Sequence, residues 1–131
     1  MSAKPGVVFV CVANSFRSQM AEGAARKLAG DSWEIWSAGS RPGGGAHPLA
    51  IALMDEVGVD LRSHLSKGIA DLPSREWNYV VTMGCGDACP MLPAKHRLDW
   101  ELPDPAGLSM EEARRIRDRI ISDVKAILQK P

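Results

Sequence analysis

The stretch from Val7 to Val12 constrains the fold more than any other part of the chain. It is an unbroken apolar run rich in valine, which is typical of a strand buried on both faces of a parallel sheet. Helical spacing follows in Ser18–Ala29, and Gly30 marks a helix end. The apolar stripe of that helix is made by Met20, Ala24 and Leu28. A buried strand that leads through a short loop into a helix predicts an α/β domain.

The rest of the chain continues this alternation. Short apolar runs predict three more strands, Trp33–Ser37, Asn78–Met83 and Arg97–Trp100. A second helix is predicted at Pro48–Val57, and the last begins at a capping box of Ser109 and Glu112. We expect the many charges of the last helix to form its solvated face. We therefore predict one α/β domain over residues 1–131, with a central four-stranded parallel sheet flanked by helices.

The composition excludes several classes of protein. Apolar residues make up 45% of the 131 residues and charged residues 24%, enough for one sizeable core. Lys plus Arg number 16, as do Asp plus Glu, and this balance argues against binding to nucleic acid or to a membrane surface. The sequence lacks the roughly 20-residue apolar run of a membrane helix and the pattern of a signal peptide. We expect a soluble, cytoplasmic protein.

The segment Cys11–Ser18 joins the first strand to the first helix, which is where α/β sheets bind ligands. A helix N-terminus with free backbone N–H groups favours a tetrahedral oxyanion, and Arg17 can clamp two of its oxygens. Both features favour the thiolate form of Cys11, which then faces the anion as a nucleophile, while Ser18 can donate a hydrogen bond to the sulfur. The anion-binding residues are predicted to be Val12, Ala13, Asn14, Ser15, Phe16 and Arg17. The alternative is a buried structural thiol beside a surface arginine.

The sequence from Val8 to Gly23 resembles the start of the low-molecular-weight tyrosine phosphatase superfamily. Within it, Arg-Ser-Gln-Met-Ala-Glu is more similar to the thioredoxin-coupled arsenate reductase branch than to the phosphatases. Further matches cover nearly the whole chain: Ser37-Ala38-Gly39, His47-Pro48 with Ala50-Ile51, Glu56-Val57-Gly58-Val59-Asp60 and Asp104-Pro105-Ala106-Gly107. The resemblance implies an oxyanion as substrate and thioredoxin, or another thiol reductant, as partner.

Two more cysteines, Cys85 and Cys89, come just after the third predicted strand and are expected at the same sheet edge as Cys11. Three residues separate them, and Gly84 and Gly86 loosen the backbone, so the two thiols can approach to disulfide distance. Hydrolysis needs no such pair, whereas a reductase must supply two electrons. Two alternatives stay open: inert small residues, and a structural zinc site, for which the histidines have no ligand spacing.

The resemblance implies a relay between these thiols. Cys11 attacks arsenate to form a thiol-arsenate adduct, and Cys85 attacks Cys11, so that arsenite leaves and a Cys11–Cys85 disulfide forms. Cys89 then attacks Cys85, and an external dithiol reduces the resulting Cys85–Cys89 disulfide. The resemblance also assigns the general acid to Asp104, which lies between two prolines that would aim its carboxyl group at the anion. No bound cofactor is expected.

The chain departs from the branch at three places. Phe16 stands where relatives often have a further cysteine, without expected loss of activity, and Cys85 and Cys89 are closer together than in the best-known members. Some relatives hold a potassium ion behind the loop, and Asn14, Glu22 and Ser37 match its ligand positions. Where those relatives have an aspartate, however, this chain has Lys67, whose ammonium group can replace the ion. We therefore predict no metal.

Arsenate reduction for arsenic detoxification is the function that these observations favour. The alternative is a phosphatase that hydrolyses phosphoesters through a Cys11 phosphoenzyme. Phosphatases of this family usually have tyrosines after their Asp-Pro motif, whereas Ala106 and Gly107 follow Asp104-Pro105 here. A non-catalytic oxyanion-binding module is a third possibility, and the intact Cys11, Arg17 and Ser18 argue against it.

Overall fold

Four parallel strands form one sheet in the order β2-β1-β3-β4. They are β1 (Gly6–Cys11), β2 (Glu34–Gly39), β3 (Trp77–Thr82) and β4 (Ala94–Asp99). The computed structural model describes residues 4–12, 14–41, 43–83, 92–103, 105 and 107–130. All six residues of β1 are buried, as its apolar run predicts, and β1 lies in the interior of the sheet. The predicted four-stranded parallel sheet is confirmed.

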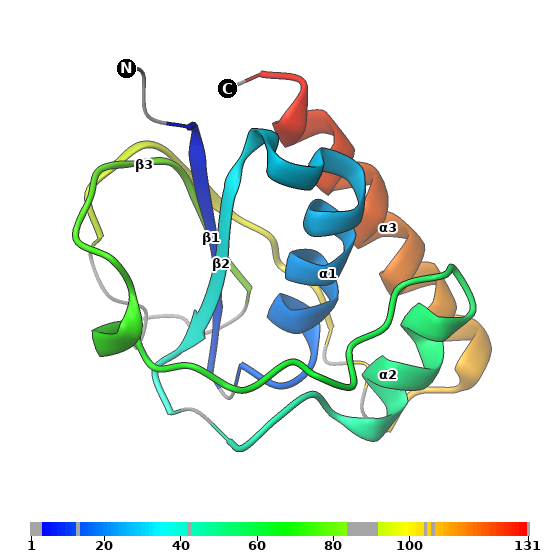
Figure 1. The fold of residues 1–131 in the computed structure, drawn as a ribbon. Helices are drawn as coiled ribbons and strands as arrows, with labels where there is room; N and C mark the ends of the chain where they lie inside the picture. Colours follow the sequence, from blue (N-terminus) through cyan, green and yellow to red (C-terminus); the bar gives the residue numbers. More distant parts are fainter. Residues whose placement is uncertain are drawn as a thin grey trace.

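Three α-helices pack against one face of this sheet (Figure 1). They are α1 (Arg17–Ala29), α2 (Pro48–Asp55) and α3 (Met110–Leu128), with short 3-10 turns η1 (Gly30–Ser32) and η2 (Ile69–Asp71) between elements. On the helical face, Val7 and Phe9 of β1 join the main core. On the other face, Val8 and Val10 form a smaller cluster, which in the described part of the chain is covered by η2 and the residues around it. None of the helices described is long and apolar enough to cross a membrane.

Helix α1 ends where predicted, but its apolar stripe is exposed in the last turn. Gly30 ends the helix with a φ of 57°, a conformation that favours glycine. Met20 and Ala24 are buried as expected, but Leu28 is 44% exposed. The apolar stripe therefore predicts the helix correctly but does not stay buried to its end, where Leu28 lies near the partly buried Val57.

Helix α3 corrects a second expectation. Its start is as predicted: Ser109 Oγ accepts a hydrogen bond from the Glu112 N–H at 3.2 Å. Its charged side chains, however, do not all lie on the solvated face, because Arg117 is only 7% exposed. The Arg117 guanidinium donates to the Leu53 carbonyl at 3.0 Å and to the Glu56 carboxylate at 2.6 Å. A charged side chain of α3 therefore joins this helix to the end of α2.

Candidate active site

Cys11 is the last residue of β1, and its buried sulfur lies inside the turn that leads to α1. The Asn14 N–H donates to Cys11 Sγ at 3.2 Å, and Ser18 Oγ lies 2.8 Å from the same sulfur. A thiolate has no proton, so Ser18 is the donor once Cys11 is ionised. The structure thus brings Cys11 and Ser18 together as predicted, and two donors stabilise negative charge on the sulfur.

Asn14 sets the direction of the Ser18 hydroxyl. Its side-chain Nδ2 donates to Ser18 Oγ at 2.9 Å, which leaves the hydroxyl proton free to point at Cys11. Asn14 is fully buried and has a φ of 52°, the left-handed conformation that Asn tolerates better than most residues. Since Asn14 contacts the sulfur through its backbone N–H and Ser18 through its side chain, it organises the loop as well as lining it.

The N-terminus of α1 carries the rest of the anion site. Phe16 is its N-cap residue and provides no side-chain hydrogen bond, so the first N–H groups of α1 are not satisfied by a side-chain cap. Such groups, together with the helix dipole, attract an anion. Arg17 begins the helix, and its Nη1 donates to the Leu102 carbonyl at 2.8 Å. Leu102 precedes the predicted acid Asp104 by two residues, so Arg17 ties the anion site to the chain segment that leads to Asp104.

The outer side of the loop is held by the segment that leads into α2. The Arg41 N–H donates to the Val12 carbonyl at 2.8 Å, and the His47 N–H donates to the Ser15 carbonyl at 2.7 Å. The rings of Phe16 and His47 stack with centroids 4.8 Å apart. Sequence reasoning missed the part played by His47, although its place directly before Pro48 marks it as a helix N-cap.

The inner side of the loop rests on buried and half-buried polar side chains. Gln19 Nε2 and Ser66 Oγ both donate to the Asn14 carbonyl, at 3.0 Å and 2.8 Å. His64 Nδ1 lies 2.8 Å from Gln19 Oε1. Burial lowers the pKa of His64, so its neutral ring donates to Gln19 and fixes that amide. Sequence reasoning also missed Gln19, Ser66 and His64. For Gln19 the available signal was that polar residues continue through the buried side of α1.

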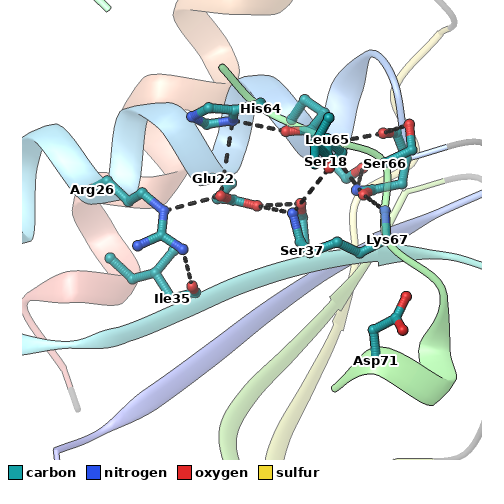
Figure 2. A network of polar contacts seen from close by, with 12 residues as sticks. Ser18, Glu22, Arg26, Ile35, Ser37, His64, Leu65, Ser66, Lys67 and Asp71 are labelled. Carbon is teal, nitrogen blue, oxygen red and sulfur yellow. Dashed lines mark hydrogen bonds and ion pairs between the residues drawn. The ribbon is translucent and has the colours of Figure 1, made fainter. Parts of the chain in front are cut away.

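Behind these residues lies the carboxylate of Glu22, with its side chain only 5% exposed (Figure 2). Ser37 Oγ and Lys67 Nζ both donate to Oε1, the latter at 3.1 Å, and Arg26 Nε donates to Oε2 at 2.9 Å. Burial raises the pKa of the Glu22 carboxyl, but the Ser37 hydrogen bond and the Lys67 charge outweigh this effect. The pKa therefore lies below its ordinary value, and Glu22 is ionised.

The residues that the resemblance matches to a potassium site, Asn14, Glu22 and Ser37, do not fit an added cation here. Glu22 Oε1 already accepts from Ser37 and Lys67, and Asn14 Oδ1 accepts from the Lys67 N–H at 2.7 Å. The positive charge of the ammonium would also repel a metal ion. In the described part of the chain, no three His, Cys, Asp or Glu side chains are grouped to hold a metal.

Four predicted site residues, Ala13, Cys85, Cys89 and Asp104, lie outside the described residues. The chain nevertheless leaves β3 beside β1, since the Met83 N–H donates to the Val10 carbonyl at 2.8 Å. Cys85 follows Met83 by two residues in the sequence. Among the described residues, the structure unites Cys11, Asn14, Arg17 and Ser18 at one sheet edge, which is suited to bind an oxyanion and attack it with a thiolate.

Comparisons with known proteins agree with this geometry. The family model described as low molecular weight phosphotyrosine protein phosphatase matches residues 6–130. An arsenate reductase of Staphylococcus aureus (strain Newman) is 42% identical over 121 residues, or 89% of this chain and 91% of the relative.

Two solved structures have the same fold. An arsenate reductase in the phosphate binding state is 35% identical with a TM-score of 0.85, over 96% of this chain and 98% of that one. A thioredoxin-dependent arsenate reductase of Corynebacterium glutamicum is 39% identical with a TM-score of 0.79. That match covers 98% of this chain, which spans 62% of the longer relative.

Proposed function

The chain belongs to the low molecular weight phosphotyrosine protein phosphatase family, and we propose that within it the protein is an arsenate reductase that uses thiols as its only reductants. The observation that carries this proposal is the position of the Cys11 sulfur, 2.8 Å from Ser18 Oγ and 3.2 Å from the Asn14 N–H, at the start of a helix without a side-chain cap. Relatives and solved structures named arsenate reductase, at 35–42% identity, support it.

The first chemical step follows from the geometry of the loop. Arsenate binds through the N–H groups at the start of α1 and the Arg17 guanidinium, both of which stabilise its negative charge. The Cys11 thiolate then attacks arsenic, one oxygen leaves as water after protonation, and a thiol-arsenate adduct forms. The Ser18 hydroxyl, directed at the sulfur by Asn14, makes Cys11 a better leaving group in later steps. Asp104 is the proposed source of the proton.

Two further thiols complete the proposed reaction. Cys85 attacks the Cys11 sulfur, a Cys11–Cys85 disulfide forms, and arsenic leaves as arsenite with the electron pair of the broken S–As bond. Cys89 attacks Cys85, which frees Cys11 and leaves a Cys85–Cys89 disulfide. The contact of Met83 with Val10 supports the attack by Cys85 because it holds the chain beside β1 two residues before Cys85.

The reductant that restores Cys85 and Cys89 is proposed to be thioredoxin or a dithiol of similar potential. The thioredoxin-dependent relative of Corynebacterium glutamicum supports this choice. A catalytic cycle that ends in a disulfide requires thiols that are kept reduced, and the cytoplasm provides such an environment. We therefore place the protein in the cytoplasm, with arsenic detoxification as its role.

Variants in which one cysteine is replaced by serine test the relay. Reduced protein is incubated with arsenate and thioredoxin, arsenite is quantified, and disulfides are mapped by mass spectrometry. Cys89→Ser should produce about one arsenite per protein and then stop, because no Cys89 thiol is present to attack Cys85 and release Cys11 from the Cys11–Cys85 disulfide. Cys85→Ser should produce none, although phosphate still binds. Continued turnover of Cys89→Ser at the wild-type rate would refute the relay.

Phosphoester hydrolysis by the same variants distinguishes the phosphatase alternative. Hydrolysis of p-nitrophenyl phosphate requires only Cys11 as nucleophile, Arg17 to bind the phosphate and Asp104 as acid. Cys85→Ser should therefore keep whatever hydrolysis the wild type has while losing arsenate reduction. A wild type that hydrolyses the ester and yields no arsenite would be a phosphatase. Phosphate binding without either reaction would identify a non-catalytic module.

A further inference from the structure

The backbone of Lys67 connects the anion loop to the end of β2. Its N–H donates to Asn14 Oδ1 at 2.7 Å, and its carbonyl accepts from the Gly39 N–H at 2.8 Å. The next residue, Gly68, forms a parallel bridge with Gly39, so this stretch runs as an extension of the sheet. Lys67 is therefore fixed at both backbone groups, and its side chain starts from a defined position.

The Lys67 ammonium lies among oxygen atoms behind the loop (Figure 2). Nζ is 3.1 Å from Glu22 Oε1 and 3.2 Å from the Leu65 carbonyl. With its side chain 22% exposed, Lys67 pairs with a carboxylate that is almost completely enclosed. A buried carboxylate needs compensating positive charge. Arg26 supplies it at Oε2, and the Lys67 ammonium has the place at Oε1 that a bound cation would otherwise need to fill.

A count of the permanent charges leads to the same conclusion. Glu22 contributes one negative charge, and Lys67 and Arg26 contribute two positive charges within hydrogen-bond distance of it. His64 Nδ1 lies 3.8 Å from Glu22 Oε2 and remains neutral. The cluster is already positive, and both carboxylate oxygens are occupied.

We propose that Lys67 is a positioning residue that acts as a built-in cation: its ammonium neutralises Glu22 while its backbone N–H holds Asn14, so that the oxyanion loop forms without a metal ion. Asn14 links this arrangement to the reacting sulfur, because the same residue donates to Cys11 Sγ and to Ser18 Oγ. The inference concerns the oxyanion site of the proposed function, and its test measures phosphate binding rather than turnover.

The experiment compares sodium with potassium at equal ionic strength. Inorganic phosphate affinity is measured by calorimetry, and thermal melting is recorded for each protein in both buffers. The wild type should bind phosphate equally well in both. Lys67→Asp places two carboxylates near one another, so it should bind phosphate about tenfold or more weakly in sodium and recover in potassium, which can lie between them. Lys67→Met should be weak in both buffers, and Lys67→Arg should stay close to wild type.

A matched lysine serves as the control. Lys27 Nζ also donates to backbone carbonyls, those of Val57 and Gly58 at 3.0 Å and 3.3 Å, but Lys27 lies on the exposed side of α1. Lys27→Met should leave both phosphate affinity and the response to potassium unchanged. Tighter phosphate binding by the wild type in potassium, or unchanged affinity of Lys67→Met in sodium, would overturn the proposal; the first comparison needs no variant to fold. A protein that passes these tests but yields no arsenite contradicts only the proposed function.

Discussion

Glu22 and Glu56 are both carboxylates paired with two permanent cations, but they lie in contrasting surroundings. Glu22, with Arg26 and Lys67, is 5% exposed and lies behind the anion loop. Glu56, with Arg114 and Arg117, is 37% exposed and joins α2 to α3. Hydrogen bonds from the two arginines hold the pKa of Glu56 at about 2. The same ionic chemistry therefore maintains a reactive site in one region and a helix contact in the other.

What separates the two regions is the cost of removing one partner. Water can solvate Glu56 or Arg114 after the loss of a partner, and the nearly buried Arg117 keeps its bonds to Asp118 and to the Leu53 carbonyl. The Glu56–Arg114 pair is therefore weakly coupled and is screened by salt. Glu22 has almost no access to water, and each of its contacts continues into another element, such as the bond from Arg26 Nη2 to the Ile35 carbonyl at 2.6 Å. A change at Glu22 should therefore reach the loop, whereas a change at Glu56 should stay local.

The largest effect is expected from Lys67→Met. It leaves the buried Glu22 carboxylate paired with Arg26 but without the Lys67 ammonium at Oε1, and it should lower the free energy of unfolding by about 2–3 kcal/mol. Urea denaturation monitored by tryptophan fluorescence measures this change. A loss similar to that of an exposed pair would show that burial does not distinguish the two carboxylates.

Glu22→Gln should have a smaller effect than Lys67→Met. The amide keeps the hydrogen bond with Ser37, and the Lys67 side chain is long enough to turn its ammonium toward water. We expect a loss of about 1–2 kcal/mol in unfolding free energy, again by urea denaturation, together with weaker phosphate binding. An unchanged phosphate affinity would show that the Glu22 carboxylate does not support the oxyanion loop.

Glu56→Gln should cost still less, and its effect should depend on pH. The folded-state pKa of Glu56 is depressed from 4.5 to about 2, so its stabilising contribution is present above pH 4.5 and is lost as pH falls toward 2. The melting temperatures of wild type and variant should differ at pH 7 and converge near pH 2. Phosphate affinity at pH 7 should not change, and a clear loss would contradict the separation of the two regions.

The effect of high salt on the stability differences between wild type and variants should be the smallest of these effects. At 1 M NaCl the Debye length is roughly 3 Å, so the Glu56 pairs should be largely screened. The stability difference between wild type and Glu56→Gln should then shrink, while that between wild type and Lys67→Met persists. Denaturation at low and high salt measures both, and equal shrinkage would mean that solvent reaches Glu22 as readily as Glu56.

The sequence predicts the fold best where burial leaves a continuous pattern. The valine-rich strand and the helix after Ser109 are found where the patterns place them. Strand β4 begins at Ala94 rather than at Arg97, because an edge strand with exposed Lys95 and Arg97 has no apolar run to mark its start. Edge strands are paired on one side only, and polar side chains are common there.

In the candidate site, the sequence predicts the contacts between neighbouring residues but not those between distant ones. Cys11, Arg17 and Ser18 are close in sequence, so a strand-loop-helix pattern is enough to bring them together. Gln19 and His64 meet across 45 positions of the chain, and no local pattern records such a contact. The residue type of Lys67 predicts that its ammonium replaces a cation, but only the structure shows that its backbone also holds Asn14.

The N-terminus of α1, which has no side-chain cap, couples oxyanion binding to the stability of the fold. Because the N-cap residue Phe16 provides no side-chain hydrogen bond to those N–H groups, an oxyanion that binds them stabilises the native state by mass action. Arsenate and phosphate are both tetrahedral oxyanions, so ambient phosphate would protect the protein against unfolding and proteolysis while it competes with arsenate for the loop. Selectivity would then come from the chemistry that follows binding, since only arsenic can accept the electron pair that the thiols deliver.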